Sequence, residues 1–379
     1  MKGLAITEKG LEGIAAKEIE EKTGSKGKTD TTTIIFDVKK EKDLCKLAYT
    51  AQSVSRILLL VSEFKVSKEL EETVENLKKK TDLSSVKKWS ELKTRVKCER
   101  EGKHDFNSVD LAGEAGRWLG SKDYNVSLKN EELKLYIYVY EDRGYFCVDF
   151  SGRDLSKRNY RIFTKAGTLK GTLGYTLVRL ADYEPGEKVL NANGGMGVIA
   201  IEAALMAIKK PVNYYQKEFA FQKLDKSYEE VFEEEDKKIE EDVEGICCYD
   251  RLLRNVSGAK KNAKIAGVDK AVNFSKIEIE WLDTKFDEDE LDKLITKLPS
   301  PSNRMPKKHM QKLYEEFFYQ TEFIVKDDGL VMICSLKNDV LKEVADKKGY
   351  EVTDEKSIYS GQEEYKVTFL KKVYKEDNQ

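Results

Sequence analysis

A glycine-rich turn between an apolar strand and an apolar helix constrains the fold of this chain more than any other stretch. The residues from Lys188 to Leu190 predict a short buried strand, and those from Val198 to Ala207 predict a helix rich in alanine and isoleucine. Between them, Gly194, Gly195 and Gly197 predict a tight turn whose backbone N–H groups point toward a ligand. Strand, turn and helix form the first half of a Rossmann-type unit. Alone, the pattern is weak evidence for a nucleotide site, because the turn itself can require glycine.

Composition sets limits on size and partners. The 379 residues are enough for two or three domains, and 36% of them are charged. The net charge of −2 gives no overall nucleic-acid signal, so any RNA binding must come from local basic patches.

Location and metal content are also constrained by the sequence. No apolar run approaches the roughly 20 residues that span a bilayer, and the N-terminus has no signal-peptide pattern. We therefore expect a cytoplasmic protein without membrane contact. The six cysteines form no Cys-x-x-Cys pair, which suggests structural thiols in a reducing compartment. His104 and His309 are too few to anchor a metal site, so we expect no metal.

Strand and helix signals alternate in the first 150 residues. Up to residue 65 their order predicts a small α+β module, and from there to residue 150 the order is helix, strand, helix, strand, strand. Gly144 marks the turn of the last hairpin. The expected strands are 3–7, 31–38, 56–64, 93–98, 133–140 and 145–149, and the expected helices are 11–22, 42–51, 68–79 and 107–119.

The C-terminal half shows the alternation expected of an α/β domain with a parallel sheet. A very acidic helix, 225–242, interrupts this alternation. An antiparallel hairpin over 350–374 closes the sheet. The other expected strands are 188–190, 245–249, 271–277, 291–298 and 329–336, and the other expected helices are 169–180, 198–207, 254–266, 308–325 and 339–348.

Five segments resemble, in order and spacing, the THUMP-domain RNA guanine-N2 methyltransferases. The family has a His/Ser-Lys-Arg-Gly-Tyr-Arg segment, an Asp-Pro-x-Cys-Gly-Ser-Gly-Thr turn, an Arg-x-Phe-Ala-Phe segment and an Asn-Ala-x-x-Ala-Gly helix. The resemblance is firm from about Asp149 to the C-terminus and looser before it. The segments that carry it, besides the glycine turn, are Asp154–Ile162, Ala166–Leu173, Asn213–Phe221, Tyr249–Asp250 and Lys261–Val268.

The resemblance implies four parts of the chain: a ferredoxin-like module (1–65), a THUMP RNA-binding domain (66–150), a linker (151–168) and a Rossmann-fold class I methyltransferase domain (169–379). It also implies S-adenosylmethionine as the cofactor and structured RNA, tRNA or rRNA, as the partner.

Two groups of basic residues are candidate RNA contacts. Alternation places Lys93, Arg95 and Lys97 on one strand face, where they could equally protect a solvated edge strand. In the linker, basic residues alternate with aromatic ones, a pattern suited to phosphate neutralisation and base stacking. The linker could instead pack under the catalytic domain. Its candidate contacts are Lys157, Arg158 and Arg161.

The resemblance implies a cofactor site that has partly changed. The family opens its glycine motif with an Asp that helps to bind the methionyl part, and this chain has Asn191, which keeps an acceptor oxygen but loses the charge. Asn193 falls in the altered part of the motif, while Gly195 and Gly197 are retained. Asp250 ends the second strand, where an acid bridges the ribose hydroxyls.

The expected catalytic motif has changed further. In the family, Asn/Asp-Pro-Pro-Tyr orients the exocyclic amine and stacks on the flipped base. The matching residues here are Lys297, Leu298, Pro299 and Ser300. A lysine side chain has three donors and no acceptor, and serine has no aromatic face, so only the proline matches.

Two hypotheses follow. In the first, the protein is a catalytically impaired member of the family that binds RNA, with a protein partner or a chaperone role. In the second, it is an active S-adenosylmethionine-dependent tRNA or rRNA guanine-N2 methyltransferase with divergent motifs. The substitutions at Lys297 and Ser300 favour the first, and the retained Asp250 and glycine turn support the second.

Overall fold

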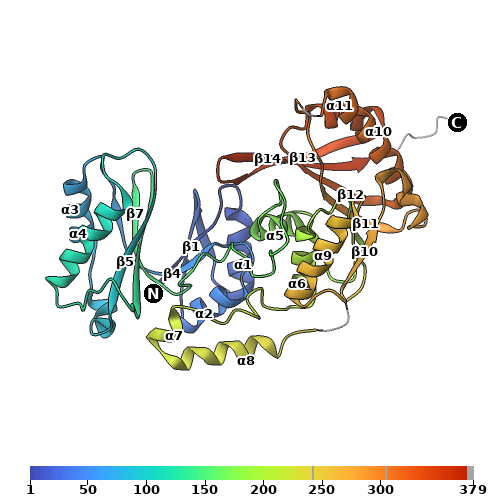
Figure 1. Ribbon diagram of the computed structural model, residues 1–379. Helices are drawn as coiled ribbons and strands as arrows, with labels where there is room; N and C mark the ends of the chain where they lie inside the picture. The colour runs from blue at the N-terminus through green and yellow to red at the C-terminus, as the bar shows by residue number, and fades with distance from the viewer. Residues whose placement is uncertain (241–242, 304, 374–379) are drawn as a thin grey trace. The chain divides into compact units, whose positions relative to one another are not determined.

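The computed structural model describes residues 1–240, 243–303 and 305–373 (Figure 1). The chain divides into two compact units, each built on a seven-stranded sheet. The first unit comprises residues 1–7, 15–155 and 216–237, and the second comprises 8–14, 156–215 and 238–379. In the part of the chain that the structure describes, no helix is both long enough and apolar enough to cross a membrane.

The sheet of the first unit has the strand order β2-β3-β1-β4-β7-β6-β5. The expected ferredoxin-like and THUMP segments therefore share one sheet, joined where β4 pairs antiparallel with β7. β5 lies at one edge and pairs with β6 in parallel. The strands are β1 (Lys2–Ile6), β2 (Gly27–Asp30), β3 (Thr33–Asp37), β4 (Arg56–Lys65), β5 (Thr94–Glu101), β6 (Leu133–Tyr140) and β7 (Arg143–Asp149).

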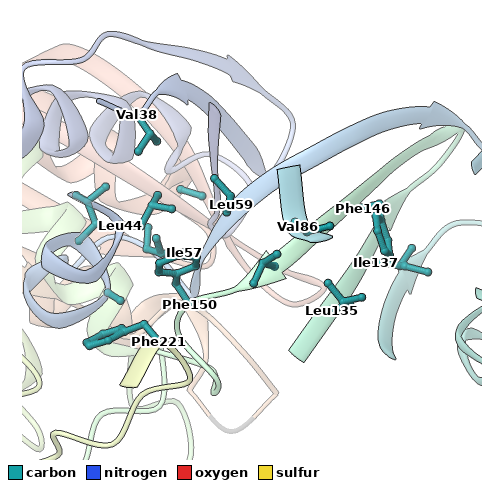
Figure 2. Packing of buried hydrophobic residues seen from close by; sticks show 14 of the residues in the cluster. Val38, Leu44, Ile57, Leu59, Val86, Leu135, Ile137, Phe146, Phe150 and Phe221 are labelled. Carbon is teal, nitrogen blue, oxygen red and sulfur yellow. The ribbon is translucent and has the colours of Figure 1, made fainter. Parts of the chain in front are cut away.

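Helices cover one face of this sheet and enclose a continuous apolar core, while strand residues form a smaller cluster on the other face. Figure 2 shows part of that core, in which Leu44, Ile57, Phe150 and Phe221 come from four separate segments. Asn107 begins α4 as its N-cap, because its side chain accepts the first free N–H groups of the helix. The helices are α1 (Glu12–Thr23), α2 (Glu41–Thr50), α3 (Leu70–Lys80), α4 (Ser108–Gly120), α7 (Phe221–Leu224) and α8 (Glu230–Asp236), with the 3₁₀ turns η1 (Ser84–Trp89) and η2 (Lys226–Glu229).

Residues 216–237 belong to this first unit, whereas the sequence placed them inside the Rossmann domain. The acidic segment is also less regular than expected, since it forms η2 and α8, and residues 241–242 lie outside the described part. Phe232 of α8 packs against Tyr49 of α2, with ring centroids 4.8 Å apart. The surrounding acids form ion pairs with lysines of α2, and Lys42 lies 2.7 Å from Glu234. Aromatic packing and charge pairing together attach this segment to the first unit.

One further element differs from expectation. The sequence predicts one strand over residues 31–38. In the structure this stretch begins with the turn of the β2–β3 hairpin, and the strand β3 follows the turn. Thr32, between these strands, has a φ of +63°, a conformation that breaks a strand.

The second unit has the order β10-β9-β8-β11-β12-β14-β13, parallel up to β12 and closed by an antiparallel hairpin. This confirms the expected α/β class with a Rossmann-type sheet. The strands are β8 (Val189–Asn191), β9 (Ile246–Asp250), β10 (Val272–Lys276), β11 (Leu291–Lys297), β12 (Val325–Ser335), β13 (Tyr350–Ser360) and β14 (Glu363–Lys372).

Apolar residues on both faces of this sheet are covered by helices, and alternate residues of β12 enter two different clusters. One cluster includes residues of α5, α6 and α9, and the other includes residues of α10 and α11. The helices are α5 (Gly171–Leu180), α6 (Val198–Ala207), α9 (Leu253–Ala266), α10 (Lys307–Ile324) and α11 (Asp339–Lys347), with the 3₁₀ turn η3 (Ile279–Thr284). This arrangement leaves the carboxyl ends of the parallel strands open for a site.

Candidate functional site

A cavity of about 680 Å³ lies at the carboxyl ends of the parallel strands of the second unit. Open α/β sheets bind their ligands at this edge, and the volume suits a small organic molecule. Its walls come from the loop 165–169, the glycine turn after β8, the residues that follow β9 and β10, the end of β11 and the start of α10.

The glycine turn has the geometry that its sequence predicts. Gly195 and Gly197 have φ values of +58° and +80°, in the left-handed region that glycine tolerates. A Cβ on Gly197 would lie 2.9 Å from the Cβ of Ala259, and one on Gly194 would lie 2.5 Å from the sulfur of Cys248. Gly194 and Gly197 are therefore required by close packing between the turn and its neighbours, whatever the turn binds.

Asp250 lies at the end of β9 and is fixed by three N–H donors. Its Oδ2 accepts the Gly195 N–H at 2.9 Å, and its Oδ1 accepts the Leu252 N–H and the Asn255 amide, each also at 2.9 Å. The Oδ1 of Asn255 is buried and has no hydrogen-bond partner among the described residues. Asn255 lines the cavity beside Asp250 and was not singled out from the sequence.

The two asparagines of the altered glycine motif hold neighbouring strands together. The Asn191 amide donates to the Ile295 carbonyl at 3.0 Å, and the Asn193 amide donates to the Lys297 carbonyl at 2.8 Å. Both residues line the cavity, and Asn191 is 3% exposed. Their donors thus link β8 and its turn to β11, and a direct ligand role for either residue remains a prediction.

Lys297 ends β11, and its side chain lies against Tyr365 of β14. Its Nζ donates to the Gly167 carbonyl at 2.7 Å and to the Tyr365 hydroxyl at 3.3 Å, and it lies 4.4 Å from the centre of the tyrosine ring. Burial lowers the pKa of this ammonium, and the charge of Lys165 lowers it further. A cation therefore occupies the strand end where the resemblance implies an amine-orienting acceptor.

The rest of the expected catalytic motif is held by protein contacts. Leu298 is buried, with 1% of its surface exposed. The Tyr314 hydroxyl donates to the Pro299 carbonyl at 2.5 Å. The Ser300 Oγ accepts the Lys337 N–H at 3.0 Å and donates to the Lys337 carbonyl at 3.1 Å. The motif therefore has no aromatic ring, and its one side-chain acceptor, the Ser300 Oγ, is engaged by Lys337.

One expected RNA contact is wrong. Arg158 is 5% exposed, and its guanidinium forms an ion pair with Glu202 of α6 inside the second unit. A buried, paired arginine cannot neutralise a phosphate, so Arg158 stabilises the fold. A single acid in the otherwise apolar helix α6 was the sequence signal for such a partner.

The other basic candidates are divided between the two units. Lys93, Arg95 and Lys97 lie on or next to β5, an edge strand, as expected, and Lys97 is exposed. In the second unit Lys157 is exposed, and the Nε of Arg161 is buried without a hydrogen-bond partner among the described residues. RNA contact by these four exposed or partly exposed side chains and by Arg161 stays a prediction.

Comparison with known proteins connects this geometry to a family. The model for the RMKL-like methyltransferase domain (UPF0020) matches residues 158–366, more than half of the chain. A tRNA (guanine(6)-N2)-methyltransferase from Methanocaldococcus jannaschii is 26% identical over 372 residues, covering 93% of this chain and 95% of the relative. A second one, from Archaeoglobus fulgidus, is 25% identical and covers 93% of this chain and 87% of its own. The fold matches SMU.472, solved with S-adenosylhomocysteine, with a TM-score of 0.81 and 19% identity over 99% of this chain and 98% of that one.

Proposed function

Because the chain belongs to the family of RMKL-like methyltransferase domains, we propose that it binds S-adenosylmethionine and structured RNA but transfers methyl groups poorly. One observation carries the proposal: Lys297, Leu298 and Pro299 line the cavity without the side-chain groups that orient an amine, and the adjacent Ser300 bonds to Lys337. The nucleoside part of the cavity, around Asp250, keeps its acceptors.

The residues present fit the nucleoside part of the cofactor. Asp250 and Asn255 would accept the ribose hydroxyls, and the unpartnered Oδ1 of Asn255 gains a donor if a ligand binds there. Leu252 and Ile277 supply apolar wall. When bound, S-adenosylmethionine supplies a methyl group on a positively charged sulfur, ready for attack by a nucleophile.

The acceptor side of the cavity fits an amine substrate poorly. An exocyclic amine needs oxygen acceptors that hold its N–H groups, leaving the nitrogen lone pair free to attack. Lys297 can only donate, and both the Lys297 carbonyl and the Pro299 carbonyl already accept protein hydrogen bonds. Ser300 offers no ring on which a flipped base could stack. The side chains from Lys297 to Ser300 therefore neither orient nor stack the expected base.

RNA binding rests on the curated relatives and on the basic edge of the first unit. Both relatives described above are tRNA methyltransferases and share nearly the whole chain. We propose that Lys93, Arg95 and Lys97 contact phosphates, as a THUMP domain between residues 66 and 150 would. If methyl transfer is impaired, the protein would assist a protein partner or act as an RNA chaperone.

A second function is favoured by the same relatives. Their curated activity is transfer to guanine N2, and the similarity covers 93% of this chain. An active tRNA or rRNA guanine-N2 methyltransferase would have to orient its substrate with main-chain groups or with residues supplied by the RNA. Methyl transfer to unmodified tRNA at rates typical of enzymes, about 1 to 1,000 per second, would favour this function over the impaired one.

Calorimetric titration with S-adenosylmethionine and S-adenosylhomocysteine tests the cofactor site. We expect binding by the wild type and at least about tenfold weaker binding by Asp250→Asn, because the amide turns one acceptor into a donor facing N–H groups. Asp346→Asn, a change in an exposed acid of α11, is the matched control and should bind normally. Absence of binding at millimolar ligand would overturn the proposal.

Filter binding of tRNA tests the RNA site. Replacing Lys93, Arg95 and Lys97 together by glutamine should weaken binding and lower the dependence of affinity on salt, by roughly 0.7–0.9 in slope for each phosphate that is no longer neutralised. A control with the same charge change replaces three lysines that are already paired with acids in the second unit. Equal weakening in both variants would contradict a specific phosphate site. The control lysines are Lys326, Lys342 and Lys366.

A further inference from the structure

Helix α9 of the second unit presents a face of positive charge. Its residues from Leu253 to Ala266 include one arginine, three lysines and no acid, although the whole chain has a net charge of −2. Arg254, Lys261 and Lys264 follow one another at helical spacing and are exposed, so they share the solvent side of the helix. This side of α9 therefore carries a strong local charge that the overall composition conceals.

These cations are not neutralised by the protein. In the part of the chain that the structure describes, Arg254, Lys261 and Lys264 form no ion pair with a carboxylate. Asp250, the acid that precedes the helix, is buried and accepts three N–H groups. Arg254 also lies in the first turn, where the helix dipole disfavours a cation, and only Lys264, in the last turn, is favoured by it. Helix stability therefore does not explain the charge of this face, which suits an anionic partner.

An exposed aromatic ring lies beside the same face. Phe163 is 37% exposed, and the Nζ of Lys261 lies 5.0 Å from the centre of its ring. The side chain of Asn262 holds the loop against α9, because its Oδ1 accepts the Phe163 N–H at 3.0 Å and its amide donates to the Phe163 carbonyl at 2.9 Å. A Cβ on Gly258 would lie 3.5 Å from the Cβ of Phe163. The ring is thus fixed next to the cations while much of it stays open to solvent.

The cations and the ring adjoin the rim of the cavity. The Asn262 amide also donates to the carbonyl of Met196 at 3.1 Å, and Met196 lines the cavity. At the start of α9, Leu252 and Asn255 line it as well. From Arg254 to Lys264 the helix extends about 15 Å, at a rise of about 1.5 Å per residue, which is long enough to contact several phosphates of one strand. A strand on this face would therefore lead to the cavity.

We propose that Arg254, Lys261, Lys264 and Phe163, the α9 surface, bind an unpaired RNA strand next to the nucleotide that enters the cavity. The inference rests on the RNA binding of the proposed function and adds a contact surface on the second unit. The cations neutralise phosphates of the strand, and the phenylalanine ring stacks on one of its bases. A duplex would offer phosphates but no unstacked base, so the ring favours an unpaired strand.

Filter binding of a short single-stranded RNA to the full chain tests the cations. Replacing Arg254 and Lys261 together by glutamine should weaken binding at low salt at least about tenfold and lower the salt slope by about 1.4, which is about 0.7 for each phosphate. The control replaces Lys347 and Lys371, two exposed lysines of the same unit, by glutamine and should keep the wild-type slope. Equal decreases in both double variants would mean that only the total charge matters, and would overturn the α9 surface.

Variants of Phe163 test the unpaired strand. Phe163→Ala should weaken binding of the single strand by roughly tenfold and leave binding of a duplex of the same length within about twofold of the wild type. Phe163→Tyr keeps a ring and should bind the single strand normally. The bonds from Asn262 reach only the backbone of Phe163, so the loop keeps them in both variants. Equal weakening for strand and duplex, or no rescue by tyrosine, would contradict stacking on an unpaired base.

The α9 surface and the proposed function fail in different ways. If the full chain binds tRNA, but the α9 double variant and Phe163→Ala bind every RNA as the wild type does, the α9 surface is wrong and the proposed function stands. If the wild type binds neither tRNA nor the single strand at low salt, both proposals are overturned.

Discussion

The guanidinium of Arg158 and the carboxylate of Glu202 form an ion pair in the interior of the second unit, with Nε and Oε1 2.9 Å apart and neither side chain exposed. The Tyr160 hydroxyl donates to the same carboxylate oxygen at 2.7 Å. Burial beside this acid raises the pKa of Tyr160 well above its usual value. The start of the linker is therefore attached to α6 by a charged network, which fixes where the chain enters the cavity wall.

Removing one partner of this network should destabilise the protein strongly. Arg158→Met leaves the Glu202 charge buried and unpaired, so we expect the free energy of unfolding to fall by about 3–5 kcal/mol. Urea unfolding measures the change. Lys157→Met, at the exposed neighbouring position, should stay within about 0.5 kcal/mol of the wild type. Similar decreases in the two variants would contradict a special role for the buried pair.

Restoring the family's motif should restore methyl transfer. Lys297→Asn, Leu298→Pro and Ser300→Tyr together supply an acceptor and an aromatic ring, and we expect transfer of labelled methyl groups to unmodified tRNA to rise at least about tenfold. The substitutions also remove the hydrogen bonds to Gly167 and Lys337, so unfolding of the variant is measured alongside. A folded variant that binds cofactor and RNA without any gain would show that this motif is not what limits transfer.

Substitutions at two glycines separate the cost of a steric clash from the cost of a strained backbone conformation. Gly197→Ala places a residue at φ +80° and a methyl group 2.9 Å from the Cβ of Ala259, so we expect a decrease of about 2–4 kcal/mol in unfolding free energy. Gly186→Ala also has a positive φ, +99°, but its Cβ meets no atom within 4 Å, so about 1–2 kcal/mol is expected. Equal decreases would mean that the turn shifts to relieve the clash and that packing against Ala259 contributes nothing to the decrease.

The lowered pKa of Lys297 predicts a pH dependence of stability. Burial makes the folded state release this proton at a lower pH than the unfolded chain does. Between the lowered pKa and the ordinary lysine pKa of about 10.4, the unfolded state binds more protons, so stability rises with pH. The wild type should therefore gain stability relative to Lys297→Met between pH 8 and pH 10. A stability difference between the wild type and Lys297→Met that stays flat over this pH range would contradict the lowered pKa.

Local patterns predict most elements of this fold, because strand and helix periods are properties of neighbouring residues. The helix expected over residues 198–207 is observed at those residues, and so is the strand over 133–140. These periods give no information about which distant segments pair with each other. The pairing of β4 with β7, which joins two expected modules in one sheet, links Leu58 to Asp149 across more than ninety residues. Only the folded structure reveals that pairing.

The residues of the candidate site likewise include some that local sequence patterns predict and others that depend on contacts between distant segments. Asp250 could be placed from its position at the end of a predicted strand, since parallel strands end at one edge of the sheet. Arg158 could not, because its burial depends on a partner 44 residues away. Lys165 gives no sequence signal that separates it from other loop lysines, and its position beside Gly195 in the cavity wall is known only from the structure.

Residues 216–237 belong to the first unit although they follow part of the second unit in the sequence. This affects folding during synthesis and the choice of fragment boundaries. A ribosome that has released residues 1–155 has delivered the whole seven-stranded sheet, but the rings of Phe219 and Phe232 that contact Tyr49 are still unsynthesised. The first unit therefore completes its core only after the glycine turn of the second unit has emerged. Fragments cut at the sequence boundaries near 150 or 168 would expose this aromatic surface, and we expect them to aggregate where the full chain does not.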